Sequence, residues 1–531
     1  MSAHTNGNGE AGKLYAKMEE RMMMRDQKGS SAVFYDLVKA GRPLQEIIAE
    51  GVRIHAPYTH VPYHERIDDG YPNFVNNDHC LLSARAAINL TKLMPKGMEM
   101  LPVAQTMWYI PTGLDIWNQK LNKAPGHYTR GMPMQPENPP MPVRYWADQE
   151  PTRSNEPLRE QLNNWMTQVH RGQVIDAYRS FLGMMEDKAN HKEVLGEMVF
   201  AGLIDVQDRM YMNRSYTTGH KGYRARSTVE LGNAIGWDKA HNVLYAGALD
   251  MAVGPRWYSV YEMACNTIKE HIQGEALHAV PYAGVSAGEQ SLLANNTPLS
   301  AEEEAELLTA LLDKHSPDNL NIITRLLKAG KDPRRIIDVF QIAASETIIQ
   351  THNPPNFSMP MHCYEYTNAL GWFYDNFDHP RRIRLLYIGA EFVNMTAWHQ
   401  RLSGEMIDVP AQIPSGADKL SAKQLLERIN ATTCAQQTSE SHAWVQAYLA
   451  NVGERKNLVQ TLAVIASRIG NDPHNQEIPQ NMLEDYVKNR SPNKDRILLA
   501  CAQHCSGHRK YGDILEASRR FGEAMGIEAL H

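Results

Sequence analysis

The residues best able to do chemistry in this chain are its histidines, 22 among 531 residues, which is roughly double ordinary usage. Several of them open an apolar helical pattern directly after a polar or proline-rich turn. The four clearest cases are His79, His220, His362 and His442. Each is expected to project inward from a different helix, as in the metal sites of helical bundles. Imidazole is the commonest protein ligand for iron, zinc and copper, so we predict that these four histidines bind one metal ion.

For any one of these histidines the alternative is a hydrogen-bonded core residue, the commoner role of a single histidine on an amphipathic helix. The recurrence of the pattern at several helix starts favours the metal site. Glu365 lies one turn beyond His362 and shares its face of the helix. Its carboxylate could bind a metal, orient a histidine or accept a proton, and the alternative is a surface or capping role.

Residues that could form a substrate pocket lie close in sequence to His79. The tyrosine-rich segment RIHAPYTHVPYHERIDD contains His60 and His64, either of which could act as an acid or base. The alternative for this segment is a polar loop packed on the core. Aromatic residues could shape an apolar pocket for a flat substrate, although most aromatic residues pack in cores. The candidates are Trp108, Tyr109, Trp117, Tyr364 and Trp372.

A separate metal-binding pattern occurs near the C-terminus, in CAQHCSGHRK. It sets Cys501, His504, Cys505 and His508 on one face of a helix, a spacing that could bind zinc. However, Gly507 interrupts the helix, and the paired spacings usual in zinc sites are absent. Packing within a helical core is therefore the favoured interpretation of this segment.

From Asn155 to the C-terminus, and at the His79 helix, the chain resembles the questin-oxidase-like proteins and related bacterial proteins, some of which carry an additional Rieske domain. The segments that carry the resemblance are TGHKGYRARSTVELGNAIGWDKAHNVL, MHCYEYTNALGWFYDNFDHPRRIRLL and SESHAWVQAYLA. No Rieske C-x-H…C-x-x-H pair is present in the sequence. The family is similar to fungal enzymes that open or oxidise anthraquinone-type rings, and some members resemble non-haem iron oxygenases with a histidine-rich site.

Matched residue by residue, the resemblance implies His79, His220, His362 and His442 as ligands. It also implies that a carboxylated lysine can be an extra ligand. The segment before His362, NPPNFSMP, contains no lysine, so Lys221 beside His220 is the only lysine adjacent to a proposed ligand. The alternative for Lys221 is a solvated side chain at a helix start.

Several familiar cofactor and active-site motifs are missing from the sequence. The glycine-rich stretches GVSAGEQS and AGALDMAVG do not follow a strand pattern, so they predict neither a dinucleotide fingerprint nor a P-loop. We therefore expect no flavin or nicotinamide site. GVSAG at 284–288 matches the G-x-S-x-G pattern, but because it does not follow a strand pattern it does not predict the nucleophile elbow of serine hydrolases. The sequence also lacks the H-E-x-x-H helix of zinc proteases.

The elements that must position these residues are expected to be almost entirely helical. Residues 1–12 are small and polar and predict a disordered tail, followed by a helix through LYAKMEERMMMR. Tyr58 to Glu150 is rich in proline and predicts a loop-rich segment interrupted by one helix, NNDHCLLSARAAINLTKLM. From Asn155 onward, apolar residues recur at helical spacing between short breakers. We predict a single all-α domain of stacked helical hairpins over 13–531, with a loop-rich wrapping segment at 13–150 and a helical body at 151–531.

The composition excludes several classes of protein. The net charge is -6, the hydrophobic fraction is 43%, and basic residues are scattered singly, so neither nucleic acid nor an anionic membrane is an expected partner. No apolar run is long enough to span a membrane, and the N-terminus lacks a signal-peptide pattern, which favours a cytoplasmic location. The six cysteines lie mostly in helical patterns and indicate reduced thiols.

These observations together predict a non-haem Fe(II) oxygenase that uses dioxygen to cleave or oxygenate an apolar, aromatic or phenolic small molecule. A Zn(II)-dependent hydrolase or lyase with the same histidines is the first alternative, because imidazole binds both metals. A helical scaffold that binds a protein partner without catalysis is the second. The sequence leaves open whether the chain forms a homo-oligomer.

Overall fold

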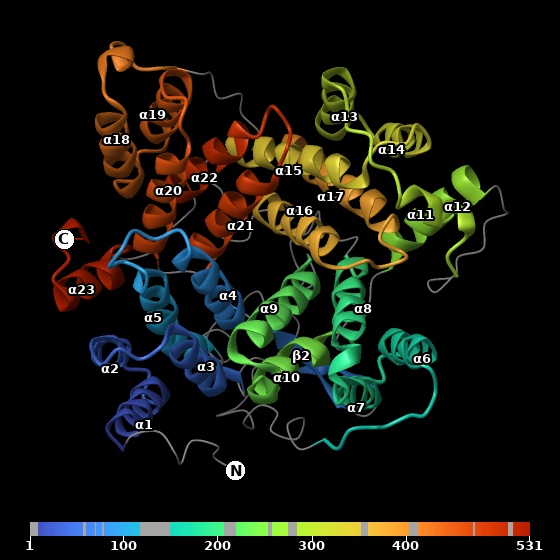
Figure 1. Ribbon diagram of the computed structural model, residues 1–531, viewed down its shortest axis with the longest axis horizontal. Helices are drawn as coiled ribbons and strands as arrows, with labels where there is room; N and C mark the ends of the chain where they lie inside the picture. The colour runs from blue at the N-terminus through green and yellow to red at the C-terminus, as the bar shows by residue number, and fades with distance from the viewer. Residues whose placement is uncertain are drawn as a thin grey trace.

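The fold is all-α, as the sequence predicts. A computed structural model describes residues 9–56, 60–68, 71–76, 79–116, 149–206, 219–252, 258–273, 284–351, 359–402, 412–470, 473–507 and 513–530. It describes only the backbone of 60–68, 71–76, 115–116, 241–242, 245–246 and 273. The described residues form twenty-three α-helices and one two-stranded sheet (Figure 1). Within this part of the chain no helix is both long enough and apolar enough to cross a membrane.

The first five helices supply most residues of a second hydrophobic cluster. The methionine-rich segment forms a helix as predicted, and its Met18 and Met22 side chains are fully buried. Methionine is an unbranched, adaptable side chain that fills irregular gaps between helices. The helices are α1 (Gly9–Met23), α2 (Gln27–Lys39), α3 (Leu44–His55), α4 (His79–Thr91) and α5 (Leu101–Ile116).

The segment predicted as loop-rich also holds a β-hairpin and the helix α5. Strand β1 (His60–Asp68) pairs antiparallel with β2 (Tyr71–Asn76), and the intervening sequence is Asp69-Gly70, a pair that two-residue hairpin turns favour. Helix α5 forms despite two prolines. Pro102 is its second residue, where a missing N–H is tolerated, and Pro111 lies inside it. Because α5 is apolar on several sides, its sequence shows little helical periodicity.

The middle of the chain forms a second set of helices that reaches the centre of the molecule. Gly202 allows α8 and α9 to approach closely, because a Cβ there would lie 2.7 Å from the carbonyl oxygen of Lys221. The helices are α6 (Leu158–Arg171), α7 (Val174–Met185), α8 (His191–Ile204), α9 (His220–Ile235), α10 (His241–Asp250), α11 (Ser259–Ile268) and α12 (Ala287–Leu292).

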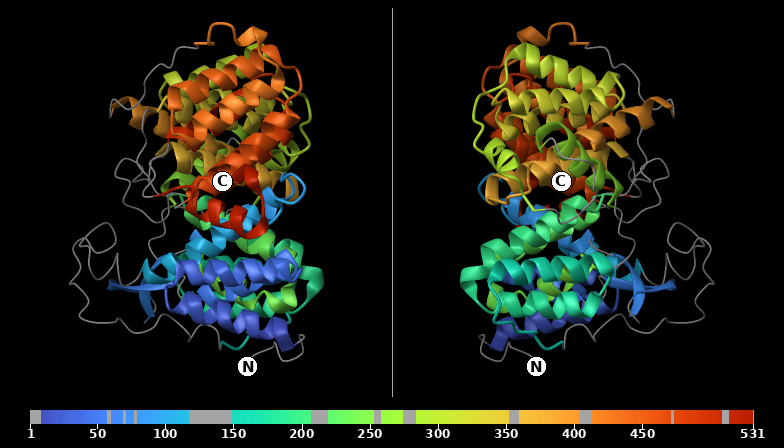
Figure 2. Two further views of the ribbon diagram at one scale, coloured as in Figure 1. Left: turned by 90° about the vertical axis from the view of Figure 1, so that its left-hand side faces the viewer. Right: turned by 90° about the vertical axis from the view of Figure 1, so that its right-hand side faces the viewer.

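The second half of the chain builds the other end of the molecule, seen in yellow to red in Figure 2. Ser300 and Ser421 begin α13 and α18 with capping boxes, which explains why these starts are readable in the sequence. The helices are α13 (Ala301–Asp313), α14 (Asp318–Lys328), α15 (Pro333–Ile349), α16 (Met359–Asn376), α17 (Arg384–Leu402), α18 (Ala422–Cys434), α19 (Thr438–Asn451), α20 (Lys456–Arg468), α21 (His474–Lys488), α22 (Asp495–Gly507) and α23 (Glu516–Met525).

The end of the chain returns to its beginning. Helix α23 packs on α2 and α5, and the ring of Phe521 stacks on that of Phe34 with centroids 6.2 Å apart. Figure 1 shows α23 beside these N-terminal helices. The hydrophobic cluster of the N-terminal helices therefore includes residues from both ends of the chain.

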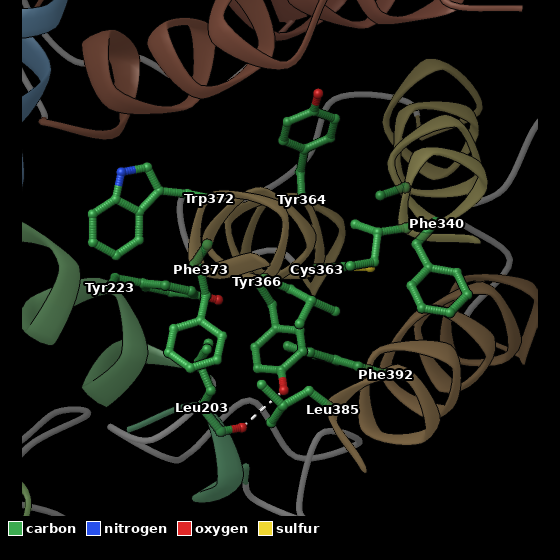
Figure 3. Packing of buried hydrophobic residues seen from close by; sticks show 14 of the residues in the cluster. Leu203, Tyr223, Phe340, Cys363, Tyr364, Tyr366, Trp372, Phe373, Leu385 and Phe392 are labelled. Carbon is green, nitrogen blue, oxygen red and sulfur yellow. Dashed lines mark hydrogen bonds between the residues drawn. The ribbon is translucent and has the colours of Figure 1, made fainter. Parts of the chain in front are cut away.

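Helix α16 is buried over most of its length and anchors the centre of the fold. The side chain of Tyr364 leaves it on one side and those of Tyr366 and Phe373 leave it on the opposite side, and all three are buried (Figure 3). The Tyr366 hydroxyl donates a hydrogen bond of 2.8 Å to the carbonyl oxygen of Leu203 at the end of α8. Such packing on several sides fixes the position of α16, and with it the residues of its first turns.

Four helices close a ring of contacts at the middle of the molecule. Helix α4 packs against α9, α9 against α16, α16 against α21, and α21 against α4. They lie together near the centre of Figure 1, between the blue and green helices on one side and the orange and red helices on the other. Segments that are far apart in the sequence are thereby brought to one place.

Candidate metal centre

One histidine from each of these four helices lies at the same end of the ring. His79, His220 and His474 are the first residues of α4, α9 and α21, and His362 is the fourth residue of α16. Three of the four histidines predicted from the sequence are therefore brought together, and the fourth helix contributes His474.

The four imidazoles follow each other in the same order as their helices. The ring centroids are 6.2 Å apart for His79 and His220, 5.1 Å for His220 and His362, 6.0 Å for His362 and His474, and 4.8 Å for His474 and His79. The Nε2 atoms of His220 and His362 are 3.1 Å apart. His362 and His474 are buried, whereas His79 and His220 are partly exposed. The accessible side of the cluster is therefore formed by His79 and His220.

Glu365 completes a compact group of ligand atoms. One ligand atom each from His362, Glu365 and His474 lie within 4.8 Å of one another, and all three side chains are buried. Glu365 follows His362 by three residues, so one turn of α16 brings both side chains to the same face. The sequence analysis proposed Glu365 as a ligand, an orienting group or a proton acceptor, and the structure places it beside the histidines. We call His79, His220, His362, Glu365 and His474 the histidine cluster.

Helix starts supply both the position and the electrostatic setting of the histidine cluster. Gly219 has a φ of +86°, a left-handed conformation that suits glycine, and it directly precedes His220. The first turn of a helix carries unpaired N–H groups and a partial positive charge. Four such helix starts converge here, which favours the Glu365 carboxylate and any further anionic ligand.

His474 was not identified from the sequence, although it follows a proline and opens a helix as the others do. The sequence HNQEIPQNMLEDYVK is mostly polar and contains Pro479, so it does not show an apolar helical face. Twelve of the fifteen residues of α21 are nevertheless buried, and seven of those twelve are polar or charged. A polar helix in the centre of a protein is costly unless its groups are paired, so it is typical of a functional site.

His442 lies on α19 and has a different set of neighbours. Its Nε2 is 3.2 Å from Nε2 of Gln446, and Gln503 of α22 is also beside it. Burial and the charge of Arg496 lower the pKa of His442. The residue after Gln503 on α22 is His504, and its Nε2 is 3.0 Å from the carbonyl oxygen of His474. Helix α22 packs against both α19 and α21. Its Gln503 lies beside His442 of α19, and its His504 lies beside His474 of α21.

Lys221, the other proposed ligand beside His220, is engaged elsewhere. Its ammonium group is 2.5 Å from the carboxylate of Asp205, and both side chains are buried. The ammonium group is thereby occupied in an ion pair and does not face the histidine cluster as a free amine. The structure therefore assigns Lys221 to a buried ion pair between α9 and the end of α8.

The other residues proposed from the sequence lie outside the histidine cluster or outside the described atoms. His60 and His64 lie on β1, and their side chains are outside the described atoms. Trp117 and His508 lie outside the described residues. All six cysteines are free, and within the described part of the chain Cys501 and Cys505 belong to no group of potential metal ligands. Tyr364 and Trp372 are core residues, whereas Trp108 and Tyr109 line a cavity.

A buried polar network joins α4 and α21 next to the histidine cluster. Arg85 of α4 donates to Oε1 of Gln480 at 2.6 Å, to Oδ1 of Asn481 at 2.8 Å and to Oε1 of Glu477 at 3.0 Å. Glu477 follows His474 by three residues, the spacing that relates Glu365 to His362. This network ties α4 to α21 one to two turns below their histidines.

Tyr223 connects the cluster to α16. Its hydroxyl donates a 2.5 Å hydrogen bond to the carbonyl oxygen of His362. Burial raises the pKa of Tyr223 well above 10, and the nearby carboxylates of Glu365 and Glu477 raise it further. Tyr223 is therefore a neutral donor that holds α9 and α16 together beside the histidines.

Asp485, further along α21, gives a testable pH dependence. Burial raises its pKa from 3.8 to about 7, and the charge of Glu484 adds to this, while a hydrogen bond from Asn368 opposes it. The folded protein therefore holds this proton up to a higher pH than the unfolded chain does. Stability falls as the pH rises from about 4 to about 7, by on the order of 4 kcal/mol from this group.

Urea unfolding of the wild type and of Asp485→Asn at several pH values checks this expectation. The variant should gain stability relative to the wild type as the pH rises from 4 to 8, because its amide does not ionise. Parallel stability curves for the two proteins would show that Asp485 is already ionised in the folded state at low pH.

In comparisons with known proteins, no family model, no curated protein and no solved structure matches the chain.

Proposed function

We propose that this protein is a non-haem Fe(II) oxygenase that uses dioxygen to cleave or oxygenate an apolar, aromatic or phenolic small molecule. The observation that carries the proposal is the histidine cluster, which gathers four imidazoles and one carboxylate from four helices, with His362, Glu365 and His474 buried. Two histidines and one carboxylate with open neighbouring positions are the ligand set typical of non-haem iron oxygenases.

The spacing of the donor atoms fits a single ion. Two nitrogen atoms that bind one ion at about 2.1 Å and at right angles are about 3.0 Å apart, and two on opposite sides are about 4.2 Å apart. The Nε2 atoms of His220 and His362 are 3.1 Å apart, close to the first value. The ligand atoms of His362, Glu365 and His474 are all within 4.8 Å, so small side-chain shifts would bring them to one ion.

Each residue of the site has a distinct task in this proposal. The four imidazoles and Glu365 would hold the ion, which leaves one position of an octahedral ion for an exogenous ligand. Bound Fe(II) would supply the activation of dioxygen. His79 and His220 form the accessible side, whereas the buried His362, Glu365 and His474 close the other side to water. Glu365 offers the carboxylate oxygen that the family resemblance would take from a modified lysine.

A zinc enzyme that activates water is the second candidate, because two histidines and a glutamate also form catalytic zinc sites. A non-catalytic scaffold is less well supported. Such a protein has no need for four imidazoles and a carboxylate brought together in its interior, where burial of polar groups is costly.

Nitric oxide distinguishes these candidates without knowledge of the substrate. Anaerobic protein loaded with Fe(II) should bind nitric oxide, a dioxygen analogue, at the open position and give the EPR signal of a high-spin iron–nitrosyl. The Glu365→Gln variant keeps the shape of the side chain but loses its charge, and it should bind iron more weakly. Tight binding of Zn(II) without binding of Fe(II), or iron that does not react with nitric oxide, would contradict an oxygenase.

A further inference from the structure

A cavity of about 280 Å³ lies between α4, α5, α21 and the start of α23, next to the histidine cluster. Ser83 lines it and follows His79 by one turn of α4, and Pro473, the residue before His474, lines it as well. The cavity is therefore about one helical turn away from two residues of the cluster.

Part of the cavity lining consists of buried polar side chains. Ser83, Gln105 and Gln476 are between 2% and 6% exposed, although each carries groups that need hydrogen bonds. The wall contains Trp108 and Tyr109. A few placed polar groups beside aromatic rings are the usual composition of a small-molecule site.

Most hydrogen-bond donors of the glutamines around the cavity are already committed to the protein. Nε2 of Gln105 donates to the carbonyl oxygens of Ser467 and Arg468 at 3.0 and 3.1 Å. Nε2 of Gln476 donates to the carbonyl oxygen of Pro102 at 3.0 Å. Nε2 of Gln27 donates to the Trp108 carbonyl and the Thr112 hydroxyl at 2.9 and 2.8 Å. Gln105 and Gln27 can therefore offer a ligand only their carbonyl oxygens, whereas Gln476 keeps one N–H besides its carbonyl oxygen.

Two further observations also indicate that the cavity favours a ligand with hydrogen-bond donors. Oε1 of Gln476 is buried and accepts no hydrogen bond from the described residues, a state that a ligand donor would relieve. Asp513 and Glu516 line the cavity with more acceptor oxygens, and each is already paired with an arginine. A carboxylate or phosphate ligand would meet acceptor oxygens on several sides, which disfavours an anion relative to a neutral hydrogen-bond donor.

We propose that this cavity binds a neutral ring compound with two or more hydroxyl groups, whose ring lies on Trp108 and whose hydroxyls donate to the glutamine oxygens. The volume limits the ligand to one or two rings, because a cavity of about 150 Å³ already holds benzene. Aromatic diols and saturated cyclic polyols share this chemistry. The binding itself does not require a metal; only the idea that the ligand is the substrate rests on the proposed function.

Calorimetry of the full-length protein with small probes tests the proposal. Hydroquinone represents the aromatic diols and myo-inositol the saturated polyols, and we expect one of them to bind. We expect 1,4-dimethoxybenzene, which has no donor, and benzoate, which is an anion, to bind at least about tenfold more weakly, as loss of one or two hydrogen bonds implies. The His362→Ala variant should bind the same probe, so failure of the metal proposal would not affect this result.

Variants of the cavity and a distant control complete the test. Trp108→Leu should weaken binding at least about fivefold through loss of ring contact, and Trp444→Leu on α19 should not. Gly470→Ala should also weaken binding, because a Cβ there would lie 2.3 Å from Oε1 of Gln105. Gln27→Leu, a change of a partly exposed side chain, covers the case in which a core variant misfolds. The proposal is overturned if neither hydroxylated probe binds, if dimethoxybenzene binds equally well, or if Trp108→Leu and Gln27→Leu bind like the wild type.

Discussion

The His474→Ala and His362→Ala variants are expected to lose most of their metal affinity. Each substitution removes one imidazole from the compact group that also contains Glu365. Loss of an outer hydrogen-bond partner of a ligand typically costs about 10- to 100-fold in affinity, so loss of a ligand should cost more. Metal content after dialysis and titration with Fe(II) or Zn(II) measure the effect.

His442→Ala is the matched control for these variants. His442 is also a buried histidine near the start of a helix, and the sequence alone ranked it with the other ligands. Its neighbours are Gln446 and Gln503, so we expect metal affinity to stay at the wild-type level. If His442→Ala lost the metal and His474→Ala kept it, the ligand set inferred from the structure would be wrong.

Replacing Arg85 by methionine should cause a large loss of stability. Methionine fills a similar volume, but it leaves the Glu477 carboxylate, which is 1% exposed, without its cation. Removing one partner of a buried ion pair costs about 3–5 kcal/mol, because the remaining charge stays in a poorly solvating interior. Chemical unfolding of the metal-free protein measures this loss separately from any effect on metal binding.

Two further variants test whether the loss of stability comes from the unpaired buried charge of Glu477. Arg85→Met combined with Glu477→Gln should recover part of the lost stability, because no uncompensated charge remains. Arg153→Met breaks a surface pair with Glu186, in which the two side chains are 69% and 42% exposed, and should change little. Equal losses for Arg85→Met and Arg153→Met would show that the buried network does not stabilise the junction of α4 and α21.

The helical architecture could be predicted because it depends on local patterns. Apolar residues at helical spacing and capping residues such as Ser300 and Ser421 are short-range signals, and the structure follows them. Helix α5 and the β-hairpin were harder to predict. In α5, apolar residues around the helix and two prolines hide the periodicity, and in the hairpin the Asp69-Gly70 pair was the available signal.

The candidate site could be predicted only in part. His79, His220 and His362 share a visible feature, a helix start after a turn, and His442 shares it as well. Which of these helix starts meet in space depends on how α4, α9, α16 and α21 pack, and a single sequence does not contain that information. His474 was missed because α21 is a polar helix in the interior, the reverse of the amphipathic pattern used to find helices.

The most direct test of the central claim is a crystal structure of the protein loaded with Fe(II) under anaerobic conditions, with anomalous diffraction at the iron edge. The account predicts one strong anomalous peak within about 2.0–2.3 Å of ring nitrogens of His79, His220, His362 and His474 and of a carboxylate oxygen of Glu365. No peak at the histidine cluster, or a peak at another group of residues, would contradict it.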